Sequence, residues 1–252
     1  MATRDKAGAG DKREQSADAF IAALKAEASD DERVKYDRYF PPATLRPGDA
    51  FVGVPMGRVF ELAGEFSAMP LDEIEDLLES DIHEARAGAV KVLALRAATR
   101  GAREQARSES FDLYLRRHDR IDSWDLVDLG APYIVGPYLF DKPRDLLDQL
   151  AGSESPWERR TALYATIAFV RTGQVDDAFR IGERLIDDPH DSVQKAVGTI
   201  LRAAGDRAPE RLRAVLERHA ATMPRVTLRM AIEKLAPRDR EHYLAMGSAR
   251  SS

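Results

Sequence analysis

A helical segment recurs along the carboxy-terminal half of the chain at intervals of about 35 residues. Three stretches, ERRTALYATIAFV, SVQKAVGTIL and VTLRMAIEKL, each pair a basic residue with a following run of small and apolar residues. The basic residues are Arg160, Lys195 and Arg229, which lie 35 and 34 residues apart. Such a period is typical of stacked helix pairs, because one pair can bury its apolar face only against its neighbours. The recurrence predicts an all-α fold, an α-solenoid of HEAT-like repeats with a concave face.

Prolines mark where these helices are expected to begin. Pro156, Pro189 and Pro224 each precede one of the three stretches, and proline is well tolerated at or near the first turn of a helix. Further upstream the period is looser, since Asp128 lies 32 residues before the first basic residue and Arg86 lies 42 residues before Asp128. We therefore expect the repeats to stack as one domain.

The remaining segments set the limits of that domain. Residues 1–16 and 247–252 are expected to be disordered tails, which leaves residues 17–246 for the repeat domain. An amphipathic pattern predicts a helix from Ser16 to Glu27, and PPATLRPGDA (41–50) predicts a Pro- and Gly-rich loop. No segment shows the alternation of a half-buried strand.

The charge is unevenly distributed. The chain has a net charge of −5, but residues 1–156 carry −9 and residues 157–245 carry +3. If successive inner helices present equivalent residues, then Arg160, Lys195 and Arg229 form a basic stripe on the concave face. A negative total therefore does not exclude a nucleic-acid partner.

Composition and missing motifs exclude several classes of site. The chain contains no cysteine, which rules out disulfides and thiolate chemistry and predicts a cytoplasmic protein. No apolar run reaches 18 residues and no secretory signal is recognisable, so we expect no membrane association. The five histidines lack zinc-binding spacing, and the nucleotide and acyl-transfer motifs are missing. We therefore expect neither a metal nor a cofactor.

One segment around a tryptophan suggests chemistry. In SWDLVD, Ser123 is a candidate N-cap, and Trp124 and Asp128 are four residues apart on one face of the helix. A carboxylate beside an indole can stabilise a developing cation. The spacing alone also fits a core tryptophan beside a solvated or salt-bridged aspartate.

Four segments in order carry a family resemblance. IDSWDLVDLGAPYIVG, SPWERRTALYATIAFVRTG, DDPHDSVQKAVGTILRAAG and TMPRVTLRMAIEKL resemble the DNA alkylation repair enzymes of the AlkD type, and the similarity extends roughly over residues 35–244. The resemblance implies a monofunctional DNA glycosylase of HEAT-like repeats that acts in base excision repair. Its partner would be duplex DNA containing alkylated bases, from which it removes cationic N3- and N7-alkylpurines, and we expect it to act as a monomer.

The resemblance also implies roles for individual residues. Asp128 would stabilise an oxocarbenium-like sugar and orient water, beside Trp124, and Arg160 would hold a phosphate next to the lesion. The residues expected to contact DNA are Arg160, Lys195, Arg229, Tyr39, Trp157 and Thr199.

One position departs from the family pattern. Thr199 stands where characterised members carry a tryptophan, and a threonine cannot stack on a sugar or a base as an indole does. The alternative function is therefore a non-catalytic HEAT-repeat protein that binds distorted or branched DNA. A protein-binding scaffold fits the acidic total but does not explain the WDLVD and WERR segments together.

Overall fold

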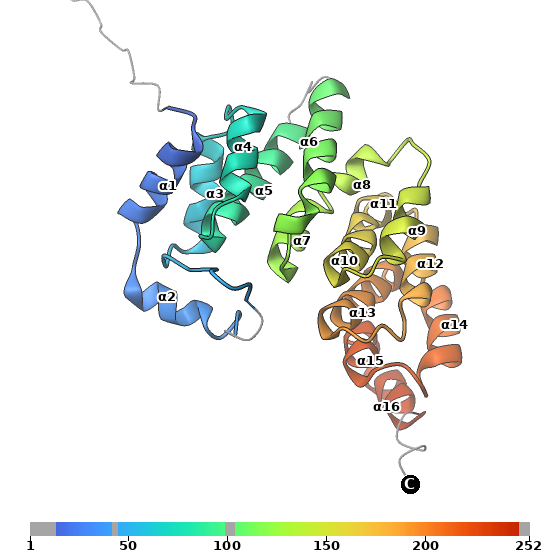
Figure 1. Cartoon of the computed structure of the whole chain (residues 1–252). Coiled ribbons are helices and arrows are strands. Elements are labelled where there is room, and N and C mark those ends of the chain that lie inside the picture. The colour runs from blue at the N-terminus through green and yellow to red at the C-terminus, as the bar shows by residue number, and fades with distance from the viewer. Residues whose placement is uncertain (1–13, 42–44, 99–103, 247–252) are drawn as a thin grey trace, which may run out of the picture. The chain divides into compact units, whose positions relative to one another are not determined.

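The computed structural model describes residues 14–41, 45–98 and 104–246 (Figure 1). Within these ranges the structure is helical, without a strand, and the only β-type contact is an isolated bridge between Ala50 and Ile82. The all-α prediction is therefore confirmed. None of the described helices is long and apolar enough to cross a membrane. The α-helices are α1 (Ala17–Ala26), α2 (Asp30–Tyr36), α3 (Met56–Glu65), α4 (Leu71–Leu78), α5 (His83–Ala98), α6 (Glu104–Arg116), α7 (Trp124–Gly130), α8 (Val135–Tyr138), α9 (Asp145–Ala151), α10 (Pro156–Ala165), α11 (Ile167–Val170), α12 (Asp176–Arg184), α13 (Asp191–Gly205), α14 (Pro209–His219), α15 (Arg225–Ala231) and α16 (Pro237–Met246).

The chain divides into two compact units, Met1–Val92 and Leu93–Ser252, and the boundary falls inside α5. The predicted carboxy-terminal tail, 247–252, lies outside the described residues, as does most of the predicted tail 1–16. Ser16 is described, and its hydroxyl caps α1 by accepting a hydrogen bond from the Ala19 N–H at 3.2 Å. The helix predicted at this point is therefore confirmed.

Buried charges organise the amino-terminal unit. The Glu84 carboxylate is fully buried and accepts hydrogen bonds from the backbone N–H groups of residues 52–54. Arg86, also fully buried, donates from both terminal nitrogens to the two carboxylate oxygens of Asp49 at 2.8 Å. These contacts from α5 hold the segment that ends the predicted loop 41–50 and the segment after it, because buried charges are stable only when they are paired.

In the carboxy-terminal unit, α7, α10, α13 and α15 form a row in which each helix packs against the next. The helices α9, α12, α14 and α16 pack against members of this row (Figure 1). The predicted helix starts are confirmed, since Pro156 occupies the first turn of α10, Pro224 is the N-cap of α15, and α13 begins two residues after Pro189.

Two glycines allow close helix packing in this unit. A Cβ on Gly136 would lie 2.3 Å from the Ala165 carbonyl oxygen and 2.7 Å from the Ala168 Cβ. A Cβ on Gly198 would lie 2.6 Å from the Thr227 carbonyl oxygen and 2.7 Å from the Met230 Cβ. At both places a side chain would force the packed segments apart.

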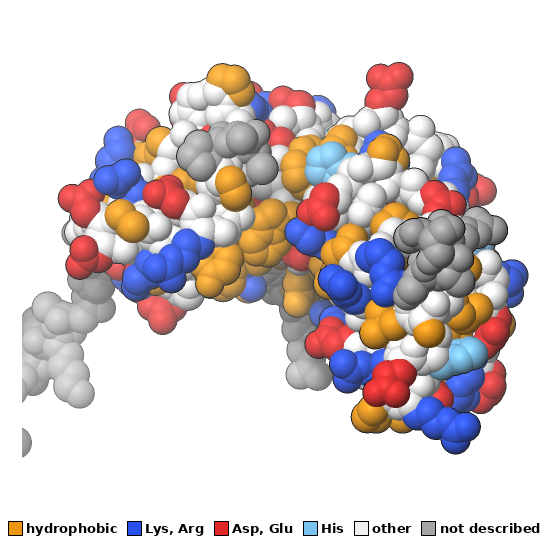
Figure 2. All heavy atoms as spheres, turned by 90° about the horizontal axis from the view of Figure 1, so that it is seen from below, with side chains coloured by type: hydrophobic (Ala, Val, Ile, Leu, Met, Phe, Trp, Pro, Cys, Tyr) orange, Lys and Arg blue, Asp and Glu red, His pale blue; other side chains and the backbone are white. Residues whose placement is uncertain are grey.

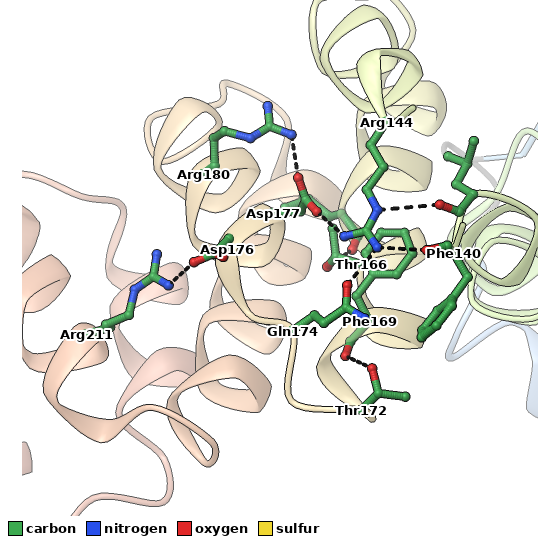
Figure 3. Close-up of polar contacts among 12 residues, drawn as sticks. Phe140, Arg144, Thr166, Phe169, Thr172, Gln174, Asp176, Asp177, Arg180 and Arg211 are labelled. Atoms are coloured by element: carbon green, nitrogen blue, oxygen red, sulfur yellow. Dashed lines mark hydrogen bonds and ion pairs between the residues drawn. The ribbon is translucent and has the colours of Figure 1, made fainter. Parts of the chain in front are cut away.

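Arg144 joins three segments of the unit (Figure 3). Its guanidinium lies 3.7 Å from the centre of the Phe169 ring and donates to the Phe140 carbonyl oxygen at 3.1 Å. It also donates to the Gln174 side chain at 2.7 Å and to the Asp177 carboxylate at 2.6 Å. An arginine can do this because its planar group offers five donors and an apolar face at once.

Several further arginines bridge the helices α9, α12 and α14. Ion pairs join Arg180 to Asp148, Arg211 to Asp176 and Arg218 to Glu183, across 32 to 35 residues of sequence. Figure 2 accordingly shows Lys and Arg side chains interspersed with Asp and Glu side chains on its right-hand side, where this unit lies. Much of the positive charge counted in residues 157–245 is therefore balanced within the fold.

Candidate active site

The segment singled out in the sequence forms α7. Ser123 is the N-cap residue, as predicted, but its hydroxyl donates to the Asp125 carboxylate at 2.5 Å and does not cap a backbone N–H. Trp124 is the first residue of the helix and is 38% exposed, whereas Asp125 is buried. One turn later, the side chain of Asp128 keeps 26% of its surface exposed. The indole and this carboxylate are therefore both accessible from the same helix.

Arg160 on α10 pairs with Asp128. Its Nε donates to Oδ1 and its Nη2 to Oδ2, each at 2.9 Å, which is the parallel two-bond geometry that suits a carboxylate. Arg160 itself is only 5% exposed. The ion pair fixes the plane of the carboxylate and leaves the aspartate as its accessible member.

The other donors of Arg160 are also used. Nη1 donates to the Ser192 carbonyl oxygen at 2.5 Å and to its hydroxyl at 3.1 Å, and Nη2 also donates to the Tyr164 hydroxyl at 3.0 Å. All five N–H groups of the guanidinium therefore have acceptors within the protein. A contact between Arg160 and a phosphate stays a prediction, and it would require one of these hydrogen bonds to break.

The pKa of the Asp128 carboxyl depends on its burial. Removal of the Asp128 carboxyl from water raises its pKa to about 6, although the neighbouring Arg160 acts to lower it. The carboxyl is thus mainly ionised near pH 7 and becomes protonated a little below that.

A buried polar cluster supports α10 next to Arg160. The Thr161 hydroxyl lies 2.9 Å from the His118 Nε2 and 3.3 Å from the Tyr114 hydroxyl. Thr161 and Tyr114 are fully buried, and His118 is 7% exposed. Burial lowers the pKa of His118, which favours the neutral imidazole at pH 7. The cluster satisfies its own polar groups and holds the helix that carries Arg160.

The other predicted site residues occupy different environments. Lys195 on α13 is exposed and pairs with Asp191 at 2.6 Å, and Arg229 on α15 is exposed. The predicted basic stripe therefore has two exposed members, because Arg160 is turned into the fold. Trp157 is half-buried with its ring centre 5.5 Å from that of His190, and Thr199 is half-buried on α13.

Tyr39 belongs to the amino-terminal unit, where it follows α2 and is 67% exposed. Its predicted DNA contact stays a prediction.

Sequence reasoning missed Tyr164 and assigned no role to Ser192. Tyr164 stands four residues after Arg160 on α10, a spacing that places two side chains on one helix face and could have suggested their contact. Ser192 is recognisable only from the fold, because it contacts Arg160 from the next helix. Among the described residues, no group of three His, Asp or Glu side chains is arranged to bind a metal ion.

Comparisons with known proteins find similarity over most of the chain. Residues 20–235 match the family described as DNA alkylation repair enzyme. A solved structure from Enterococcus faecalis, named as a predicted DNA alkylation repair enzyme, aligns with a TM-score of 0.64 at 19% sequence identity. The alignment covers 84% of this chain and 98% of the other, so the two proteins share a fold. No curated protein sequence matches the chain.

Proposed function

Because this chain belongs to the family of DNA alkylation repair enzymes, we propose that it is a DNA glycosylase that hydrolyses the N-glycosidic bond of alkylated purines in duplex DNA. The preferred substrates are cationic N3- and N7-alkylpurines. The observation that carries the proposal is the accessible, oriented carboxylate of Asp128, one helical turn from the exposed indole of Trp124.

The chemistry of these lesions suits a single carboxylate. An N-alkylated purine already carries positive charge, so it leaves with the electron pair of the C1′–N bond without a general acid. The deoxyribose becomes oxocarbenium-like, and an ionised Asp128 stabilises that charge and orients the attacking water. Water then adds to C1′ and releases one proton. No metal or cofactor is needed in this sequence of steps.

Trp124 supplies a second form of cation stabilisation. The face of an indole attracts a cation by about 0.5–2 kcal/mol, depending on how far the contact is desolvated. Trp124 is 38% exposed, so part of its surface can meet the cationic base or the developing sugar cation. Asp128 and Trp124 thus act on the same developing charge by different physical means.

Arg160 acts mainly on Asp128 in this proposal. Its two parallel hydrogen bonds orient the carboxylate, and its other donors are occupied by Ser192 and Tyr164. The exposed cations Lys195 and Arg229 are better placed to contact phosphates. The exposed ion pair of Lys195 with Asp191 opposes this only weakly, because surface ion pairs contribute little in water.

Release of free base tests the proposal directly. The purified protein is incubated with duplex DNA that contains 7-methylguanine, and the free base is separated and quantified against a reaction without protein. Protein-dependent release is expected. Binding without release would favour the alternative, a non-catalytic protein that binds distorted DNA. Thr199 supports this alternative, because a threonine in place of a tryptophan leaves the site without a second stacking surface.

A further inference from the structure

We propose that Tyr164 is a positioning residue of this site, which holds Asp128 and Arg160 in the geometry required for excision. The inference rests on the proposed function, because it assigns Tyr164 a role in that same reaction. Tyr164 lies within the segment SPWERRTALYATIAFVRTG, but the sequence analysis assigns it no role.

Tyr164 contacts the arginine of the ion pair. Its hydroxyl accepts a hydrogen bond from Arg160 Nη2 at 3.0 Å, and the guanidinium carbon lies 4.6 Å from the centre of its ring. The same nitrogen, Nη2, also donates to Asp128 Oδ2. Tyr164 therefore holds the group that in turn holds the carboxylate.

This contact constrains both the direction and the charge of Asp128 through Arg160. Arg160 defines the plane of the carboxylate through two bonds, and Tyr164 restricts Arg160 from the same helix. A cationic donor to a carboxylate favours its ionised form. Tyr164 therefore supports the ionised form of Asp128 by keeping Arg160 in place.

The groups that face Asp128 are few. From α10 they are Arg160 and Tyr164, from its own helix α7 Asp125, and from α6 Tyr114, which is fully buried. From α13, Arg202 acts electrostatically on Tyr164. Asp125 opposes ionisation of Asp128, so Arg160 on α10, held by Tyr164, is the group that favours the ionised form.

The variant Tyr164→Phe removes the hydroxyl and keeps the ring. The expected result is an upward shift of about one pH unit in the acid limb of the excision rate, the size expected for loss of one hydrogen bond to a charged group. With saturating DNA, the rate at pH 6 should fall about fivefold, while the rate at pH 8 should stay within about twofold. The apparent affinity for DNA should be unchanged.

A matched control exists on the same unit. The Tyr133 hydroxyl accepts from Arg171 at 3.4 Å, and that guanidinium lies 5.1 Å from the ring centre, so Tyr133→Phe removes a similar contact away from Asp128. This variant should reproduce the wild-type rate and pH profile. The titration of the Asp128 carboxyl, followed by carbon-13 NMR in wild type and in both variants, provides a measurement that does not depend on activity.

The two measurements separate the proposals. If Tyr164→Phe raises the Asp128 titration midpoint and shifts the acid limb, the positioning role is supported. An unchanged midpoint overturns it, and so does a loss of rate that is equal at all pH values. If the wild-type protein releases no base, the proposed function fails, and the carboxyl titration still decides whether Tyr164 controls Asp128.

Discussion

Arg160 and Asp128, separated by 32 residues in sequence, are joined by two parallel hydrogen bonds of 2.9 Å between α10 and α7. The arginine is buried and the aspartate keeps an accessible edge. Removal of either partner would leave the other in a poorly solvated place, so the pair acts as a unit. Variants of Asp128 and of Arg160 can therefore test the two roles separately.

Asp128→Asn should abolish the release of 7-methylguanine. The amide has nearly the same shape but lacks the negative charge that stabilises the sugar cation, so the rate should fall by at least about 100-fold. DNA affinity should change little, because the carboxylate is expected to contact the sugar and not the phosphates. Base release and fluorescence anisotropy on the same preparation measure the two effects. Excision at the wild-type rate would rule out the proposed role of Asp128.

Excision should depend on pH through the same carboxyl. The pKa of Asp128 is raised to about 6, so the active, ionised form is lost as the pH falls through that value. Below it the protein-dependent rate should decrease about tenfold per pH unit, and above about pH 7 it should be level. Rates are measured from pH 5 to 8 and corrected for spontaneous base loss. A rate that stays level down to pH 5 would contradict this assignment.

Arg160→Lys should reduce both stability and excision, because lysine cannot reproduce the parallel pair of hydrogen bonds. Loss of these contacts in a buried setting should lower the free energy of unfolding by about 2 kcal/mol, measured by urea denaturation. Excision should fall with it, since the carboxylate loses its orientation.

Arg159→Lys is the matched control for that variant. Arg159 precedes Arg160 on α10 and binds both oxygens of Asp188, at 2.6 and 3.0 Å. Its replacement should destabilise the protein to a similar extent and leave excision by the folded protein near the wild-type rate. Equal losses of excision in the two variants would show that general destabilisation, and not orientation of Asp128, causes the effect.

DNA affinity should depend strongly on salt. If phosphate contacts dominate binding, affinity should fall by orders of magnitude between 50 and about 200 mM salt. Lys195→Ala and Arg229→Ala should each weaken binding regardless of DNA sequence and reduce the slope of log affinity against log salt by about one. Arg180→Ala is the control, because Arg180 lies on α12, outside the row of helices that carries Lys195 and Arg229. Salt-insensitive binding would instead indicate a protein partner.

The sequence predicted the helices well and the environment of Arg160 poorly. Capping and proline positions indicate where helices begin, so Ser123 and Pro156 could be assigned from local chemistry, and the amphipathic pattern placed the start of the first helix at Ser16. Periodicity shows which helices are equivalent, but it does not show how far a long side chain extends. Arg159 and Arg160 are adjacent and point about 100° apart on the helix, so only the fold reveals which one reaches Asp128.

The prediction of a basic surface depended partly on net charge. The excess of basic residues after position 156 suggested a basic surface, but a count does not separate paired from unpaired groups. Arg211 and Arg218, for example, are paired with acidic residues of α12. The same distinction holds at the candidate site. The four-residue spacing places Trp124 and Asp128 on one helix face, whereas the contacts of Tyr164 and Ser192 can be seen only in the tertiary structure.

Gly136 lacks a Cβ, and this determines how closely two helical segments near the candidate site can approach. Gly136 meets the carbonyl of Ala165, the residue after Tyr164 and five after Arg160, with no space for a Cβ. Any side chain at this position would push the α8 segment away from the end of α10, the helix that carries Arg160. Variation at Gly136 is therefore expected to be as restricted as at Asp128, although this glycine is eight residues from Asp128 and has no chemical group to contribute.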